Sequence, residues 1–103
     1  MGLLSRKPVS EQAGNKCVKE LTIVNKLGLH ARPSAMFVKC CNRFKAEIWV
    51  EKDGESVNGK SIMGLMMLAA GHGSKLRVTC EGHDAEEALR EIEVLIQRRF
   101  DED

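Results

Sequence analysis

Residues 75–80 alternate strictly between polar and apolar side chains, and this pattern limits the possible folds more than any other feature of the sequence. In an extended strand, successive side chains point to opposite faces, so one face here would be apolar and the other polar. A parallel sheet covered on both faces would instead contain nearly continuous apolar strands. The pattern therefore predicts an antiparallel sheet that is covered on one face and open on the other.

The rest of the chain supplies the other elements of this sheet and its cover. Runs of β-branched and aliphatic residues predict strands at 18–24, 46–52 and 55–57. Helices are predicted at 31–44, 62–70 and from residue 85 onward. Asp53-Gly54 is a hairpin turn signal, and Asp84 is the expected cap of the last helix. The order βαββαβα predicts an α+β fold with three helices on one face of a four-stranded antiparallel sheet.

Length and composition fit one folded domain. The 103 residues are 43% hydrophobic and 30% charged, and the formal net charge is +1. Residues 1–16 lack an apolar period, so we expect a disordered arm there and a folded domain at 17–103. The balanced charge disfavours nucleic acid as a partner, and no apolar run reaches the roughly 20 residues that a membrane span requires.

The four cysteines, Cys17, Cys40, Cys41 and Cys80, show no CxxC spacing. Cys40, Cys41 and Cys80 fall mostly at apolar positions, where a core thiol is a more frequent outcome than a metal ligand. The first residues also lack the pattern of a secretory signal. We therefore expect reduced thiols in a cytoplasmic protein, with no metal site and no cofactor.

The segment 28–33, Gly-Leu-His-Ala-Arg-Pro, is the strongest candidate for chemistry. His30 would be the N-cap residue of the first helix, where free backbone N–H groups and the helix dipole favour an anion and a neutral imidazole. Arg32 adds a guanidinium suited to phosphate oxygens, and Gly28 permits a sharp turn. These residues could form a nucleophile whose phosphorylated product is stabilised. The alternative is that His30 only caps the helix and Arg32 is solvated.

A second candidate surface begins at Ser61, which precedes the short predicted helix. A phosphate on Ser61 would lie near free amide groups at that helix start. Ile62, Met63 and Met66 could form an apolar docking patch, because flexible methionines suit surfaces that meet several partners. The alternative is that Ser61 is only a cap and the methionines belong to the core.

Two motifs at matched spacing carry a family resemblance. The segment 28–33, with Lys-Ser-Ile-Met-Gly at 60–64, closely resembles the histidine-containing phosphocarrier protein (HPr) family of the bacterial phosphotransferase system, over about residues 18–100. The resemblance implies an open-faced β-sandwich in which enzyme I phosphorylates His30 on Nδ1 and enzyme IIA domains discharge it. Arg32 would stabilise the phosphate, with the backbone amides of Ala31 and Arg32 completing the pocket. The protein would be a stoichiometric carrier rather than an enzyme, and we expect a monomer.

The resemblance also implies that Ser61 is a regulatory site, because many bacteria phosphorylate the matching serine with a dedicated kinase, a modification reversed by a phosphorylase. On that interpretation the chain could act mainly as a phosphorylation-dependent binding module. Residues 25–30 and 66–70 look more like the nitrogen-related branch of the family than the sugar-transport branch.

Two other functions are less well supported by the sequence. Residues 54–61 formally match a nucleotide-binding P-loop, but the alternating strand at 75–80 and the small domain do not suit a parallel nucleotide-binding sheet. An RNA-binding domain could share the order of elements, yet it would need aromatic side chains on its sheet. Only four aromatic residues are present: Phe37, Phe44, Trp49 and Phe100.

Overall fold

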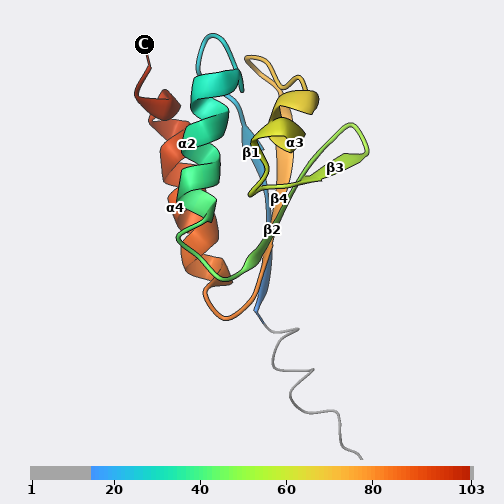
Figure 1. Cartoon of the computed structure of the whole chain (residues 1–103), viewed down its shortest axis with the longest axis vertical. Coiled ribbons are helices and arrows are strands. Elements are labelled where there is room, and N and C mark those ends of the chain that lie inside the picture. The colour runs from blue at the N-terminus through green and yellow to red at the C-terminus, as the bar shows by residue number, and fades with distance from the viewer. Residues whose placement is uncertain (1–14, 103) are drawn as a thin grey trace, which may run out of the picture.

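A computed structural model of the chain describes residues 15–102. These residues form one four-stranded antiparallel sheet with the strand order β1-β4-β2-β3 and three α-helices, an open-faced sandwich (Figure 1). The strands are β1 (Lys16–Thr22), β2 (Glu47–Lys52), β3 (Glu55–Asn58) and β4 (Lys75–Glu81). The helices are α2 (Ala31–Cys41), α3 (Ile62–Met67), α4 (Ala85–Gln97) and a short 3₁₀ helix, η1 (Arg99–Asp101). The predicted fold class and order of elements are therefore confirmed.

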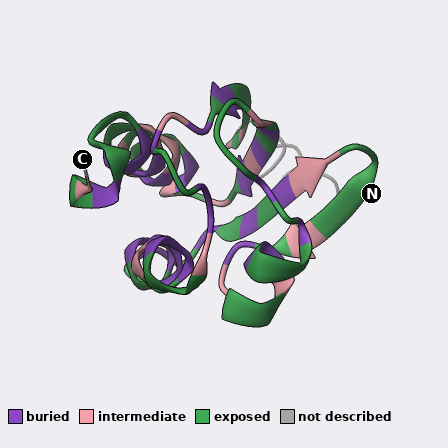
Figure 2. Cartoon of the chain, turned by 90° about the horizontal axis from the view of Figure 1, so that it is seen from above, coloured by how far each residue is buried: buried purple, intermediate pink, exposed green. Residues whose placement is uncertain are grey.

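The central strand β4 has the one-sided character that its alternation predicts. Val78 pairs with Val50 of β2 and is completely buried, whereas its neighbour Thr79 lies on the opposite face. Thr79 pairs with Val18 on one side and with half-exposed Trp49 on the other. Figure 2 shows this alternation of buried and exposed residues along the strands.

The helices α2 and α4 bury their apolar stripes in the core between themselves and the sheet. Phe37 and Cys41 of α2 and Ile92 of α4 are completely inaccessible to solvent. The predicted first helix ends too late, because α2 stops at Cys41 and the chain turns before the buried Phe44. Ala35, which matches the apolar period of α2, is exposed on the outer side of the helix.

Asp84 does not cap α4 with its side chain, contrary to the prediction. Its two carboxylate oxygens instead accept hydrogen bonds from the backbone N–H groups of Lys45 and Ala46, both at 2.9 Å. These bonds, that from Lys45 first, hold the pKa of Asp84 below its ordinary value. The carboxylate therefore fixes the segment that leads into β2.

The start of the domain differs by a residue from the prediction. Lys16, which the sequence analysis assigns to the arm, is the first residue of β1 and pairs with Glu81. Residues 1–14 of that arm lie outside the described residues. The four cysteines are free thiols, and Cys40, Cys41 and Cys80 are buried as predicted. Between residues 15 and 102, no helix has the length and apolar character needed to cross a bilayer.

Candidate functional site

The loop before α2 is held against the segment that follows α3. Gly28 has a φ of +74°, and a Cβ at this position would lie 2.4 Å from the carbonyl oxygen of Ala70. The backbone N–H of the next residue, Leu29, donates to the same oxygen at 2.8 Å. A side chain at position 28 would therefore push apart two loops that must touch, which explains the glycine.

His30 is the N-cap residue of α2, but its ring makes no capping hydrogen bond. Its backbone carbonyl accepts from the N–H of Ser34 at 3.0 Å, which starts the helix, while 39% of the side chain stays exposed. His30 therefore occupies the predicted N-cap position, but its side chain does not cap the helix. Ala31 and Arg32 are the first two helical residues, whose N–H groups have no partner within an α-helix.

A carboxylate brings His30 and Arg32 together. Oε2 of Glu102 lies 2.9 Å from Nε2 of His30 and 3.0 Å from Nη1 of Arg32. The other oxygen, Oε1, accepts a hydrogen bond from Nδ2 of Asn25 at 3.0 Å. The Asn25 hydrogen bond, followed by His30 and Arg32, lowers the pKa of Glu102. An oxyanion is therefore already bound between the two residues that the sequence singles out.

The segment that carries Glu102 has an unusual backbone. Arg99, Phe100 and Asp101 have φ values of +60°, +52° and +59°, a left-handed conformation that costs about 1–2 kcal/mol per residue. The completely buried side chain of Phe100 anchors the segment. Both terminal nitrogens of Arg32 donate to the Phe100 carbonyl at 3.1 Å, so Arg32 contacts this segment twice.

Sequence reasoning missed Glu102, Asn25 and Phe100 as parts of this site. Glu102 stands 72 residues after His30, outside both motifs, and no periodicity connects the two. Asn25 lies within the loop that leads to His30, yet nothing in its local sequence indicates that its side chain is completely buried. Only the tertiary fold brings these residues to the start of α2.

Ser61 caps α3, as one of its two interpretations states. Its Oγ accepts a hydrogen bond from the backbone N–H of Gly64 at 3.0 Å. The other part of that interpretation, that the following methionines are core residues, is wrong. Met63 is 73% exposed and Met66 44% exposed, and Ile62 is also exposed, so all three predicted docking residues are accessible.

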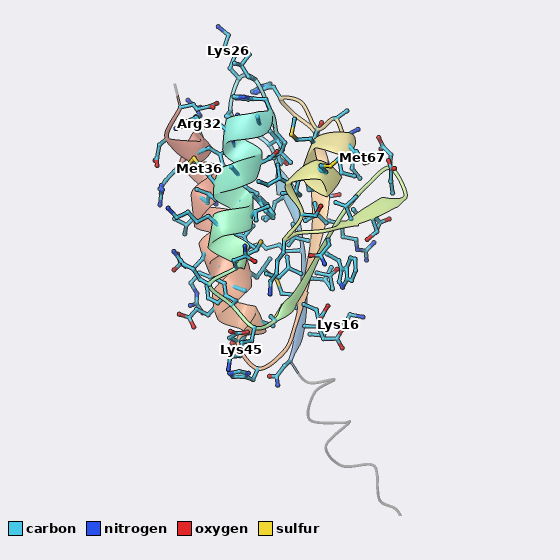
Figure 3. All side chains as sticks on the ribbon, viewed as in Figure 1. Lys16, Lys26, Arg32, Met36, Lys45 and Met67 are labelled. Carbon is cyan, nitrogen blue, oxygen red and sulfur yellow. The ribbon has the colours of Figure 1, made fainter. Side chains whose placement is uncertain are left out.

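The structure adds two exposed apolar side chains to this end of the molecule. Met67, the last residue of α3, and Leu27, in the loop before His30, are both mostly exposed. Figure 3 shows Met67 and Arg32 in the upper half of the molecule, on different helices, with Lys26 above them. The helices α2 and α3 also contact each other, so apolar and basic side chains share one end of the fold.

The structure disfavours the two alternative functions. The P-loop pattern at 54–61 begins in an antiparallel hairpin rather than after a parallel strand, so it lacks the geometry that a P-loop needs. The three phenylalanines are buried in the core. Among the residues described, Trp49 is the one aromatic side chain on the open sheet face, where an RNA-binding sheet would stack several.

Comparison with known proteins identifies the family. A family model described as the PTS HPr component phosphorylation site matches residues 17–98. The phosphocarrier protein HPr of Neisseria meningitidis serogroup A is 49% identical over 84 residues, which cover 82% of this chain and 94% of that protein.

Solved structures agree with this assignment. The crystal structure of HPr-C-His from Thermoanaerobacter tengcongensis is similar with a TM-score of 0.82 and 45% identity, covering 84% of this chain and 98% of that one. A structure of an HPr dimer from the same organism has a TM-score of 0.68 and 48% identity, covering 82% and 99%. The chain therefore belongs to the HPr family of phosphocarrier proteins of the phosphotransferase system.

Proposed function

We propose that this protein accepts a phosphoryl group on His30 from enzyme I and passes it to enzyme IIA domains. The observation that carries the proposal is the pairing of His30 with Arg32 through one oxygen of Glu102, at 2.9 and 3.0 Å. Because both side chains contact the same oxygen, the guanidinium, a group suited to phosphate oxygens, lies beside the His30 ring. The position of the ring at the start of α2 supports the same conclusion, since helix starts favour anions.

The accessibility of the ring suits transfer between proteins. A carrier must present the same atom first to a donor and then to an acceptor, so its reactive side chain has to lie on the surface. His30 is partly exposed, and the nearby N–H groups of Ala31 and Arg32 begin α2. We propose that these two amides and the Arg32 side chain bind the transferred phosphate.

The exposed apolar patch, Ile62, Met63 and Met66, is the proposed docking surface for enzyme I and enzyme IIA domains. Methionine side chains adapt their shape to different partners at small cost, which suits a carrier with two successive partners. The carrier is consumed and regenerated once per transfer and so is not an enzyme. We further propose that it acts as a cytoplasmic monomer, which light scattering after size-exclusion chromatography would test.

Incubation with enzyme I and phosphoenolpyruvate tests the function. We expect one acid-labile phosphate per chain on the wild type and none on H30A. H83A is the matched control, because His83 is an exposed turn residue distant in sequence from both motifs, and it should be phosphorylated like the wild type. An unmodified wild-type protein in the presence of active enzyme I would contradict the proposal, as would full labelling of H30A.

Regulation at Ser61 is a second proposal. Its side chain is partly accessible and adjoins the docking patch, so a phosphate there would add negative charge beside the apolar surface. We propose that a serine kinase and phosphorylase act on Ser61 and that the added charge weakens binding to acidic partners. Wild type should take label from ATP in an extract of the host, and S61A should not; equal labelling of the two would reject this site.

A further inference from the structure

The side chain of Glu102 is held in place by a hydrogen bond to a buried residue, Asn25. Its Oε1 accepts from Nδ2 of Asn25, and the same nitrogen donates to the Gly28 carbonyl at 2.9 Å. Asn25 is completely buried, and only 17% of the Glu102 side chain is exposed. The carboxylate is therefore less mobile than a solvated surface charge. A hydrogen bond to it fixes the orientation of the His30 ring.

We propose that Glu102 is the positioning residue of His30: it keeps the ring proton on Nε2, leaves the lone pair of Nδ1 for phosphorus, and stabilises the cation formed by transfer. This inference rests on the proposed phosphocarrier function and adds to it the residue that selects the reacting nitrogen. The contact of 2.9 Å between Oε2 and Nε2 is its basis.

The selection of the nitrogen follows from the hydrogen-bonding capacity of a carboxylate. An ionised carboxylate has only acceptor atoms, so the partner nitrogen has to carry a proton. The neighbouring Arg32, at 3.0 Å from the same oxygen, favours the ionised form of Glu102. A neutral imidazole has one N–H, and placing it on Nε2 makes Nδ1 the nucleophile.

The transfer step balances with these groups alone. The lone pair of Nδ1 forms a bond to phosphorus, while the bond between phosphorus and the donor atom breaks and its electron pair leaves with the donor. The Nε2 proton stays on the ring, which then carries phosphorus on one nitrogen, hydrogen on the other, and a positive charge. Glu102 already lies against that N–H, so the new charge forms beside a carboxylate. Discharge to the acceptor reverses each of these changes.

The left-handed backbone at 99–101 gives Glu102 its position. A left-handed conformation persists only where surrounding contacts impose it, and here the completely buried ring of Phe100 and the two Arg32 hydrogen bonds to the Phe100 carbonyl hold the segment. The strained conformation is therefore used to place one carboxylate at one ring nitrogen.

Nitrogen-15 spectra of the neutral His30 ring test the inference without any phosphate. In the wild type the proton should reside mainly on Nε2, and E102A should lower the ratio of the Nε2–H to the Nδ1–H form by about threefold. E102D keeps a carboxylate and should restore part of the preference. E93A is the matched control, because Glu93 pairs with Lys19 of β1 and Gln97 of α4, which are not part of the His30 site, and it should leave the ratio unchanged.

The rate of phosphoryl transfer from enzyme I provides the second measurement. E102A should react about tenfold more slowly, the loss expected for one hydrogen bond to a charged group, with partial recovery in E102D. An unchanged tautomer ratio in E102A would overturn the inference, and so would transfer as fast as or faster than in the wild type, which would make Glu102 a competitor for the phosphate site. If the wild type took no phosphate, the proposed function would fail, while the tautomer ratio would still decide the role of Glu102.

Discussion

The helices α2 and α3 begin in opposite ways. At α3 the N-cap side chain caps the helix, since the Ser61 hydroxyl accepts a hydrogen bond from the backbone N–H of Gly64 at 3.0 Å. At α2 the N-cap residue is His30, whose ring turns away from the helix and contacts Glu102 instead. The side chain of Ser61 therefore caps α3, whereas the side chain of His30 does not cap α2.

The two helix starts are held in place by different kinds of contact. The uncapped start loses a favourable local interaction worth about 1 kcal/mol. Tertiary contacts replace it: Gly28 fits against Ala70, and Arg32 donates to the Phe100 carbonyl. The site therefore depends on residues distant in sequence, whereas the start of α3 depends on a tetrapeptide.

The largest expected effect comes from converting one helix start into the other. H30S places a good capping residue before α2 and removes the imidazole. We expect no phosphorylation by enzyme I, with a free energy of unfolding that stays within about 1 kcal/mol of the wild type, because the gained cap offsets the lost contact with Glu102. Labelling and urea denaturation measure the two quantities. Phosphorylation of H30S at the wild-type level would show that the imidazole is not the acceptor.

The second largest effect is expected at Gly28, where the loop before α2 closely approaches Ala70. G28A should lower the free energy of unfolding by about 2–3 kcal/mol, because its Cβ would lie 2.4 Å from the Ala70 carbonyl oxygen in a backbone with positive φ. G54A is the matched control: its φ is +84° but no atom lies within 4 Å of a Cβ there, so we expect a loss of only about 1 kcal/mol. Equal losses in the two variants, measured in urea, would mean that the loop contact contributes nothing.

The cap of α3 should have a smaller effect. S61A removes the acceptor for the Gly64 N–H and should lower the free energy of unfolding by about 1 kcal/mol. S61T retains a hydroxyl acceptor and should recover most of the loss. If S61A were as stable as the wild type in thermal or urea unfolding, the contrast between the two helix starts would lose its energetic content.

The smallest effect concerns α4, whose N-cap residue Asp84 holds the loop before β2 rather than its own helix. Its pKa is lowered in the folded state, so it contributes stability above the usual carboxylate pKa, and that contribution disappears as the pH falls through the lowered value. D84N should therefore lose less stability than the wild type between about pH 6 and pH 2. Identical pH dependences in urea unfolding would assign the acid sensitivity to other groups.

Local patterns were sufficient to predict the fold. The alternation at 75–80 indicated a sheet with one open face, and β4 indeed has buried Val78 beside Thr79 on the open side. Periodicity alone gave a wrong prediction at Ala35, which matches the apolar period of α2 but is exposed. Asp84 matched the pattern of a cap, but two backbone N–H groups of another segment compete for its carboxylate, and no local pattern reveals such a competitor.

Only part of the candidate site could be predicted, because local patterns do not reveal contacts between segments that are distant in sequence. His30 and Arg32 stand two residues apart, so one motif contains both. Ser61 is a residue type that commonly precedes a helix, so its position could be predicted from the local sequence. Glu102 reaches His30 because of three consecutive left-handed residues, none of them glycine. Since sequence propensity argues against that conformation, the position of this carboxylate follows only from the assembled tertiary structure.

The nitrogen of the His30 ring that carries the phosphate can be identified directly. After reaction with enzyme I and phosphoenolpyruvate, coupling between phosphorus and nitrogen-15 in the labelled His30 ring identifies the bonded nitrogen. We expect phosphorus on Nδ1 and a proton on Nε2, facing Glu102. Phosphorus on Nε2, or on any residue other than His30, would contradict this expectation.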